Sequence, residues 1–79
     1  MLTTLFRRNG LALPTYRAVD PATGREAVVF VDPLQVPQRN TFVVVSDGER
    51  CWRCRYEPDE PLSLGFRLLG VSRAVVVFE

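Results

Sequence analysis

Histidine and lysine are absent from this 79-residue sequence, and cysteine occurs only twice. The chain therefore lacks the commonest general base, the amine that forms Schiff bases and the lysine of a phosphate-binding P-loop. The acidic residues fall in or beside predicted turns, so no two carboxylates share an apolar pocket that could separate their pKa values. These absences predict a protein that is not an enzyme and that binds no cofactor or small-molecule substrate.

The two cysteines form a single C-x-x-C motif, Cys51 and Cys54. A structural zinc site needs four ligands, and this chain offers one pair and no histidine. In a strand the two thiols would point to opposite faces, which suits neither chelation nor a disulfide. We therefore expect Cys54 to be a small core residue and Cys51 a surface or interface residue. A Cys₄ zinc site shared between two copies is the alternative.

Strong charge and long apolar runs are also missing. The net charge is +1, which excludes a global field attracting nucleic acid or anionic lipid. No apolar run reaches the roughly 18 residues of a membrane span, and the N-terminal residues do not match a signal peptide. We expect a cytoplasmic protein or part of a virion assembled there. All ten basic residues are arginine, which indicates a GC-rich genome of bacterial or phage origin.

The centre of the chain, residues 41–57, predicts a β-hairpin. Asp47-Gly48 separates two apolar-patterned runs, and Asp-Gly is a strong hairpin signal. The side chains of the second run alternate between two faces. Trp52, Cys54 and Tyr56 lie on the face expected to join the core, and the arginines lie on the face expected to meet solvent. We expect an odd-length loop with a glycine bulge. That register places Phe42 and Val44 on the face of Trp52 and Cys54.

Four further strands are predicted, two before this hairpin and two after it. Residues 16–19 and 26–31 form a first hairpin around Asp20-Pro21 and Gly24, and the run 27–31, apolar on both faces, predicts a central strand. Residues 62–68 alternate like a half-buried strand, 70–72 form a turn, and 74–78 form a last strand. Residues 5–8 are a single helical turn capped by Thr3 or Thr4, or an edge segment.

The connection 32–40 is the longest irregular segment, and Pro33 and Pro37 stiffen it. Leu34 and Val36 lie inside it. They either fold back over one end of the core or are displayed to a partner, because ordered loops often carry function.

These signals predict one all-β domain over residues 1–79. Five to six short strands with turns between them favour a small antiparallel barrel or sandwich, SH3-like or OB-like, because closure removes exposed edges.

A core of this size rarely supplies more than about 3–5 kcal/mol, so small domains often add disulfides, metals or oligomerisation. Disulfides and metals are poor options in a chain with two cysteines and no histidine. We therefore expect a non-enzymatic assembly or adaptor module that packs against copies of itself or a larger complex. Its form resembles that of small virion subunits such as head–tail connectors or decoration proteins. The expected contact residues are Leu34, Val36, Arg39, Cys51, Arg53 and Arg55. The alternative is a small barrel that binds nucleic acid through surface arginines, for which affinity would fall steeply with salt.

Overall fold

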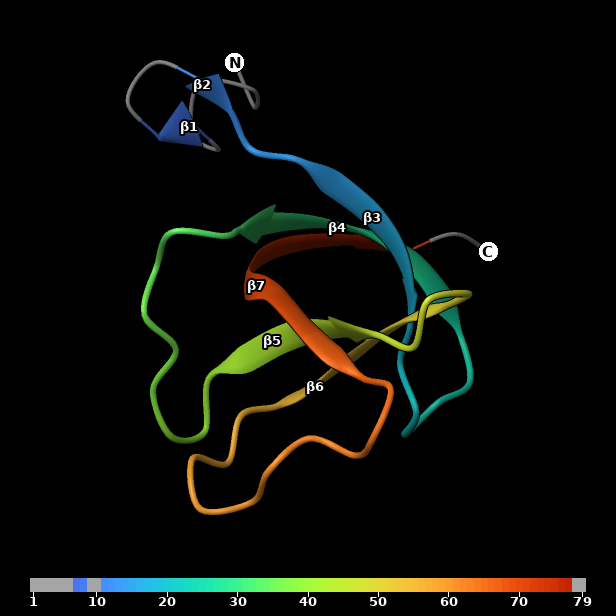
Figure 1. The fold of residues 1–79 in the computed structure, drawn as a ribbon. Coiled ribbons are helices and arrows are strands. Elements are labelled where there is room, and N and C mark those ends of the chain that lie inside the picture. Colours follow the sequence, from blue (N-terminus) through green and yellow to red (C-terminus); the bar gives the residue numbers. More distant parts are fainter. Residues whose placement is uncertain (1–6, 9–10, 78–79) are drawn as a thin grey trace.

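The computed structural model describes residues 7–8 and 11–77, and its main body is a closed barrel of five strands (Figure 1). The order around the barrel is β3-β4-β7-β5-β6, and β6 returns to β3 to close it. The closing pair is parallel and short, whereas the other four pairs are antiparallel. The barrel strands are β3 (Thr15–Val19), β4 (Glu26–Asp32), β5 (Phe42–Ser46), β6 (Cys51–Arg55) and β7 (Arg67–Val77). The small closed barrel expected from the sequence is confirmed.

A separate two-stranded ribbon precedes the barrel. It consists of β1 (Arg7–Arg8) and β2 (Leu11–Ala12), which pair antiparallel. Arg7 and Arg8 are therefore extended, so the predicted helical turn is wrong for these two residues and the edge-segment alternative holds for them. The rest of that prediction, including the Thr3 or Thr4 cap, lies outside the described residues.

The first hairpin forms as predicted. Tyr16 pairs with Val29 and Val19 pairs with Glu26. Its turn is closed by Asp20, whose carbonyl accepts from the Gly24 N–H at 2.7 Å, and Gly24 has a φ of 73°. Glycine adopts this left-handed conformation without the Cβ clash that other residues meet there. β4 lies between β3 and β7, as its run of apolar residues on both faces predicts.

The central hairpin is present, but the predicted register is wrong. Val43 pairs with Cys54, Val44 with Arg53 and Val45 with Trp52. The cause is the loop, which holds four residues, 47–50, rather than an odd number. One carboxylate oxygen of Asp47 accepts the backbone N–H of Glu49 (2.9 Å) and of Arg50 (2.8 Å), which stabilises this closure. Consequently Phe42 and Val44 share a face with the arginines of β6.

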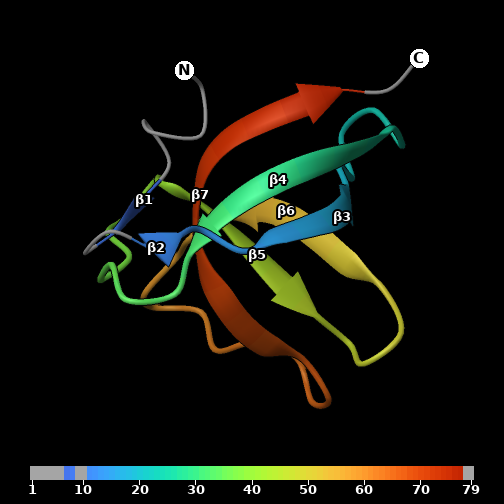
Figure 2. The same ribbon diagram turned by 90° about the horizontal axis from the view of Figure 1, so that it is seen from above.

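Two predicted elements merge in β7. The sequence predicts a strand over 62–68, a turn over 70–72 and another strand, whereas the chain is irregular over 56–66 and then extended from Arg67 to Val77. β7 bends as it passes Gly70 (φ 155°), so its first half pairs with β5 and its second half with β4 (Figure 2). A Cβ at Gly70 would lie 2.5 Å from the Asp32 carbonyl oxygen. The glycine therefore permits a close crossing of two strands and does not mark a turn.

The core has two parts because β5 is buried on both faces. One cluster consists of Ala18, Val29, Val31 and Val44. Val29 and Val31 belong to β4 and Val44 belongs to β5, and these two strands are not neighbours because β7 lies between them. The contacts of this cluster therefore cross the interior of the barrel. Val43, Val45 and Val71 form the second cluster. Because side chains alternate along a strand, this second cluster lies on the outer face of the barrel. The half-buried residues packed against it are Trp52, Cys54, Tyr56 and Phe66.

Candidate functional site: an ordered apolar loop and two cavities

The loop over residues 33–41, between β4 and β5, displays two apolar side chains. Leu34 is 69% exposed and Val36 is 77% exposed. Of the two alternatives drawn from the sequence, folding back over the core is wrong and display at the surface is correct. Leu34 and Val36 are isolated from both core clusters. Their burial therefore requires something outside the described part of the chain.

Hydrogen bonds hold this loop at its beginning and its end. Asp32 is buried, and its carboxylate accepts the Leu34 N–H at 3.0 Å. At the other end the Asn40 N–H donates to the carbonyl of Tyr56, the residue that follows β6, at 3.1 Å. In the middle, Arg73 of β7 donates to the Gln35 side chain at 3.0 Å. The loop is thus fixed to the barrel on both sides of its two exposed apolar residues.

Arg39 joins the loop to the acidic turn that follows β6. Its guanidinium donates to Glu57 at 2.9 Å and also forms an ion pair with Asp59. Exposed pairs of this kind contribute at most about 1 kcal/mol, since water and salt screen them. The expected contact residue Arg39 therefore lies beside Leu34 and Val36 along the loop but is already paired within the chain.

The other expected contact surface, made of Cys51, Arg53 and Arg55, does not form one outer face. Arg53 stacks on the ring of Phe42, with its Cζ 3.8 Å from the centroid, and its Nε donates to the Ser72 hydroxyl at 3.1 Å. Cys51 packs against the interior cluster. The prediction placed these side chains outward because it assigned the wrong register, whereas pairing with Phe42 and Val44 turns this face of β6 inward. Arg55, at the end of the strand, is exposed.

The two thiols lie on opposite faces of β6, as the strand pattern predicts. Cys51 contacts the interior cluster and Cys54 the outer one, and both are free. Burial raises the pKa of the Cys54 thiol, so that thiol favours its neutral form. Among residues 7–8 and 11–77, no three His, Cys, Asp or Glu side chains gather as metal ligands.

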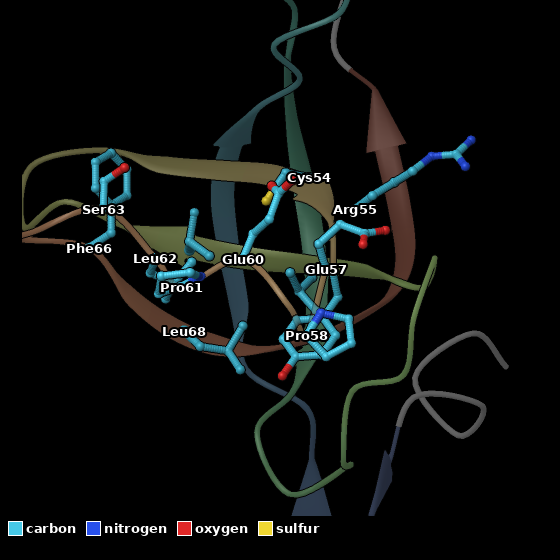
Figure 3. Close-up of a pocket in the computed structure, with 13 residues that line it drawn as sticks. Cys54, Arg55, Glu57, Pro58, Glu60, Pro61, Leu62, Ser63, Phe66 and Leu68 are labelled. Atoms are coloured by element: carbon cyan, nitrogen blue, oxygen red, sulfur yellow. The ribbon is translucent and has the colours of Figure 1, made fainter.

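A groove of about 470 Å³ runs between the outer core cluster and the segment 57–66. Figure 3 shows its lining, with Ser63 and Phe66 at one end and Arg55 and Glu57 toward the other. The sequence analysis missed this groove because it placed residues 62–66 in a strand. Gly65, which has a φ of 89°, was the signal against that strand, since glycine weakens the interior of a strand.

No family model, curated protein or solved structure matches this chain. Its function has therefore to be inferred from the geometry of its own residues. Among the residues that the structure describes, no helix has the length and apolarity needed to cross a membrane.

A second cavity, of about 210 Å³, opens at the end of the barrel where the β3–β4 turn faces β7. Its floor is apolar, from Ala18, Ala27, Val29 and Val75, and Arg53 lies in its wall. The sequence carried no signal for this cavity, because it depends on the bend of β7 and on the register of β6.

Proposed function

We propose that this protein is a non-enzymatic assembly or adaptor module that packs against copies of itself or against a larger complex, in the manner of a small virion subunit such as a head–tail connector or decoration protein. The observation that carries the proposal is the ordered loop 33–41, which holds Leu34 and Val36 in solvent while its backbone is bonded to Asp32 at one end and to Tyr56 at the other. Both apolar residues would be buried by a protein partner.

The order of the loop is what favours binding over mere exposure. Isolated apolar side chains on a surface are ordinary and need no explanation. A segment that is already fixed, however, has little conformational entropy left to lose when it binds, and this lowers the free energy required for association. Prolines at 33 and 37 and the ion pairs of Arg39 add to the same effect. The loop therefore has the properties of a preorganised contact.

The experiment is a comparison of two aspartate substitutions. Leu34→Asp combined with Val36→Asp puts charge into the proposed contact, and Leu64→Asp is the matched control, because Leu64 is fully exposed in the segment 57–66. We expect light scattering after size exclusion to give a mass above that of one chain for the wild type and for Leu64→Asp, and the mass of one chain for the double variant.

A wild-type monomer would direct the test to a larger complex. A photo-crosslinking residue at position 36, compared with one at position 64, should then give a discrete cross-linked product in the cells that make the protein. A wild type of monomeric mass with the same cross-linking at both positions contradicts the proposal.

Nucleic-acid binding is the alternative outcome of the same experiment. Arg39 is paired with acidic residues, and Arg53 is turned inward onto Phe42, so neither arginine lies unpaired on the outer surface of the barrel. A monomer that elutes with excess absorbance at 260 nm, and that binds DNA or RNA with an affinity falling steeply as salt rises, would replace the assembly proposal.

A further inference from the structure

The second half of β7 has a free edge. Residues 71–77 pair with β4 on one side, but β5 pairs only with residues 67–71. From Ser72 to Val77 the other side of the strand therefore has no ladder partner among residues 7–8 and 11–77. Figure 2 shows this part of β7 at the margin of the molecule, with β4 along one side.

Within the described residues 72–77, this edge has little of the protection that natural edge strands usually carry. Charged side chains, prolines and bulges normally prevent an edge from pairing with another chain. The stretch 74–77 is Ala-Val-Val-Val, and Val76 is 52% exposed. The nearest charge, Arg73, is turned toward Gln35 and Asp32. Of the two register shifts along β7, the one opposite Phe30/Val31 lies on the β4 side and the other lies in the half that pairs with β5.

The 210 Å³ cavity lies beside this edge. Val75 lines the cavity and pairs with Val29, which is fully buried and lines it too. Side chains of neighbouring strands form rows on each face of a sheet. An inward side chain from a strand added to β7 would therefore continue the row from Val29 through Val75 into the cavity. The cavity is smaller than the roughly 300–1,000 Å³ of sites for drug-sized ligands, so it suits a single side chain.

Arg53 supplies a cation at the same place. Its ring contact with Phe42 and its bond to Ser72 fix the guanidinium, and its Nη atoms have no hydrogen bond or ion pair to any residue in the described ranges. Arg25 and Asp20 also line the cavity, which leaves its net charge positive. A fixed guanidinium with free N–H donors is well suited to a carboxylate.

We infer that the free edge of β7 takes up an extended segment of a partner protein as an added strand. An acidic residue of that segment pairs with Arg53, and an apolar residue two positions away, on the same face, enters the cavity. This inference rests on the proposed function and names the class of partner: an extended segment with the pattern acidic–x–apolar. Backbone bonds to the edge give affinity, and the two inward pockets give specificity, as in other cases of strand addition.

The test uses the isotope-labelled full chain and a set of blocked peptides with the pattern Thr-Glu-Thr-X-Thr-Val-Thr, where X is Val, Leu, Ile or Phe, together with the reversed sequences. We expect at least one peptide to shift the backbone amide resonances of residues 72–77 on titration. Replacing its glutamate by glutamine should weaken binding about tenfold, the effect of losing a charge-assisted hydrogen bond. Methylating the peptide's backbone nitrogens that face β7 should abolish binding without altering the side chains, because those N–H groups would donate to the edge of β7.

Arg53→Gln in the protein should reproduce the loss seen with the glutamine peptide, and Arg67→Gln, on the half of β7 that pairs with β5, should leave binding unchanged. The inference is overturned if no peptide shifts residues 72–77, if glutamine in place of glutamate binds equally well, or if the shifts map to residues 34–36. Concentration-dependent shifts at 72–77 without peptide would also overturn it, because a second copy would then occupy the edge. These resonances are independent of the Leu34 and Val36 variants, so failure here is distinguishable from failure of the assembly proposal.

Discussion

Gly70→Ala tests the close crossing of β7 over the end of β4. The added Cβ would lie 2.5 Å from the Asp32 carbonyl oxygen and 2.7 Å from Val31 Cγ1, both closer than atoms can approach without movement. The backbone at Gly70 has a φ of 155°, a region that other residues occupy at a cost of about 1–3 kcal/mol. Overpacking a filled site costs a further 1–3 kcal/mol or so. The free energy of unfolding should therefore fall by about 2–6 kcal/mol.

That loss is large for a chain of this size. At roughly 0.05–0.15 kcal/mol per residue, 79 residues correspond to an unfolding free energy of about 4–12 kcal/mol. The substitution should remove a large share of it and lower Tm by about 4–8 °C per kcal/mol. The measurement is equilibrium urea unfolding followed by circular dichroism, with the slope m compared between variants to confirm that the same surface is exposed.

Gly65→Ala is the matched control for this prediction. Gly65 also has a positive φ, 89°, but a Cβ there would have no neighbour within 4 Å. Its substitution should cost only the conformational part, about 1–2 kcal/mol. The difference between the two variants then reports the contact with β4. If Gly70→Ala is no more destabilising than Gly65→Ala, the close approach of the two strands is refuted, and with it the account of β7 as one bent strand.

Three further outcomes follow from the described contacts. Val44→Ala, at a fully buried position, should lower the unfolding free energy by about 1.5–3 kcal/mol in urea titrations, whereas Val76→Ala, half exposed, should change it by less than about 0.5 kcal/mol; equal losses would contradict the assignment of the interior. Arg39→Ala should cost at most about 1 kcal/mol yet speed amide hydrogen exchange across residues 33–41, and unchanged exchange would show that its ion pairs do not order the loop. Because the pKa of Cys54 is raised in the folded state, the thiol of the unfolded chain loses its proton first as pH rises, so stability should fall above the ordinary thiol pKa of about 8.5, and pH-dependent unfolding of Cys54→Ala should lack that part of the fall.

The sequence determines the hairpins more clearly than it determines how they combine. Asp20, Pro21 and Gly24 specify the first turn through local conformational preferences, and the structure confirms that hairpin with its pairing of Tyr16 and Val29. The register of the second hairpin depended on the length of a loop. Asp-Gly is compatible with loops of two, three or four residues, and the bonds that Asp47 makes to the backbone decide between them. A one-residue error there moves every side chain of β6 to the opposite face.

The errors around β7 have a different cause. The alternation of Leu62, Leu64 and Leu68 is real, but these leucines lie along an irregular segment and the end of a strand, and Leu64 is fully exposed. Gly70 can mark either a turn or a close strand crossing, and only the position of Asp32 distinguishes the two. For the candidate site, loop 33–41 could be located by its composition, whereas the cavity beside Arg53 depends on contacts between segments far apart in the chain.

The placement of β7 has a consequence for how the protein is made. The hairpins β3–β4 and β5–β6 emerge first from a ribosome, and in the finished barrel they pair directly with each other only through the short parallel contact between β3 and β6. β7 lies between β4 and β5 and pairs with both. Until residues 67–77 have been synthesised, the apolar faces of both hairpins lack their common neighbour, and unpaired apolar strands of this kind are prone to aggregate during folding. The barrel therefore cannot close until residues 67–77 are available to pair with both β4 and β5.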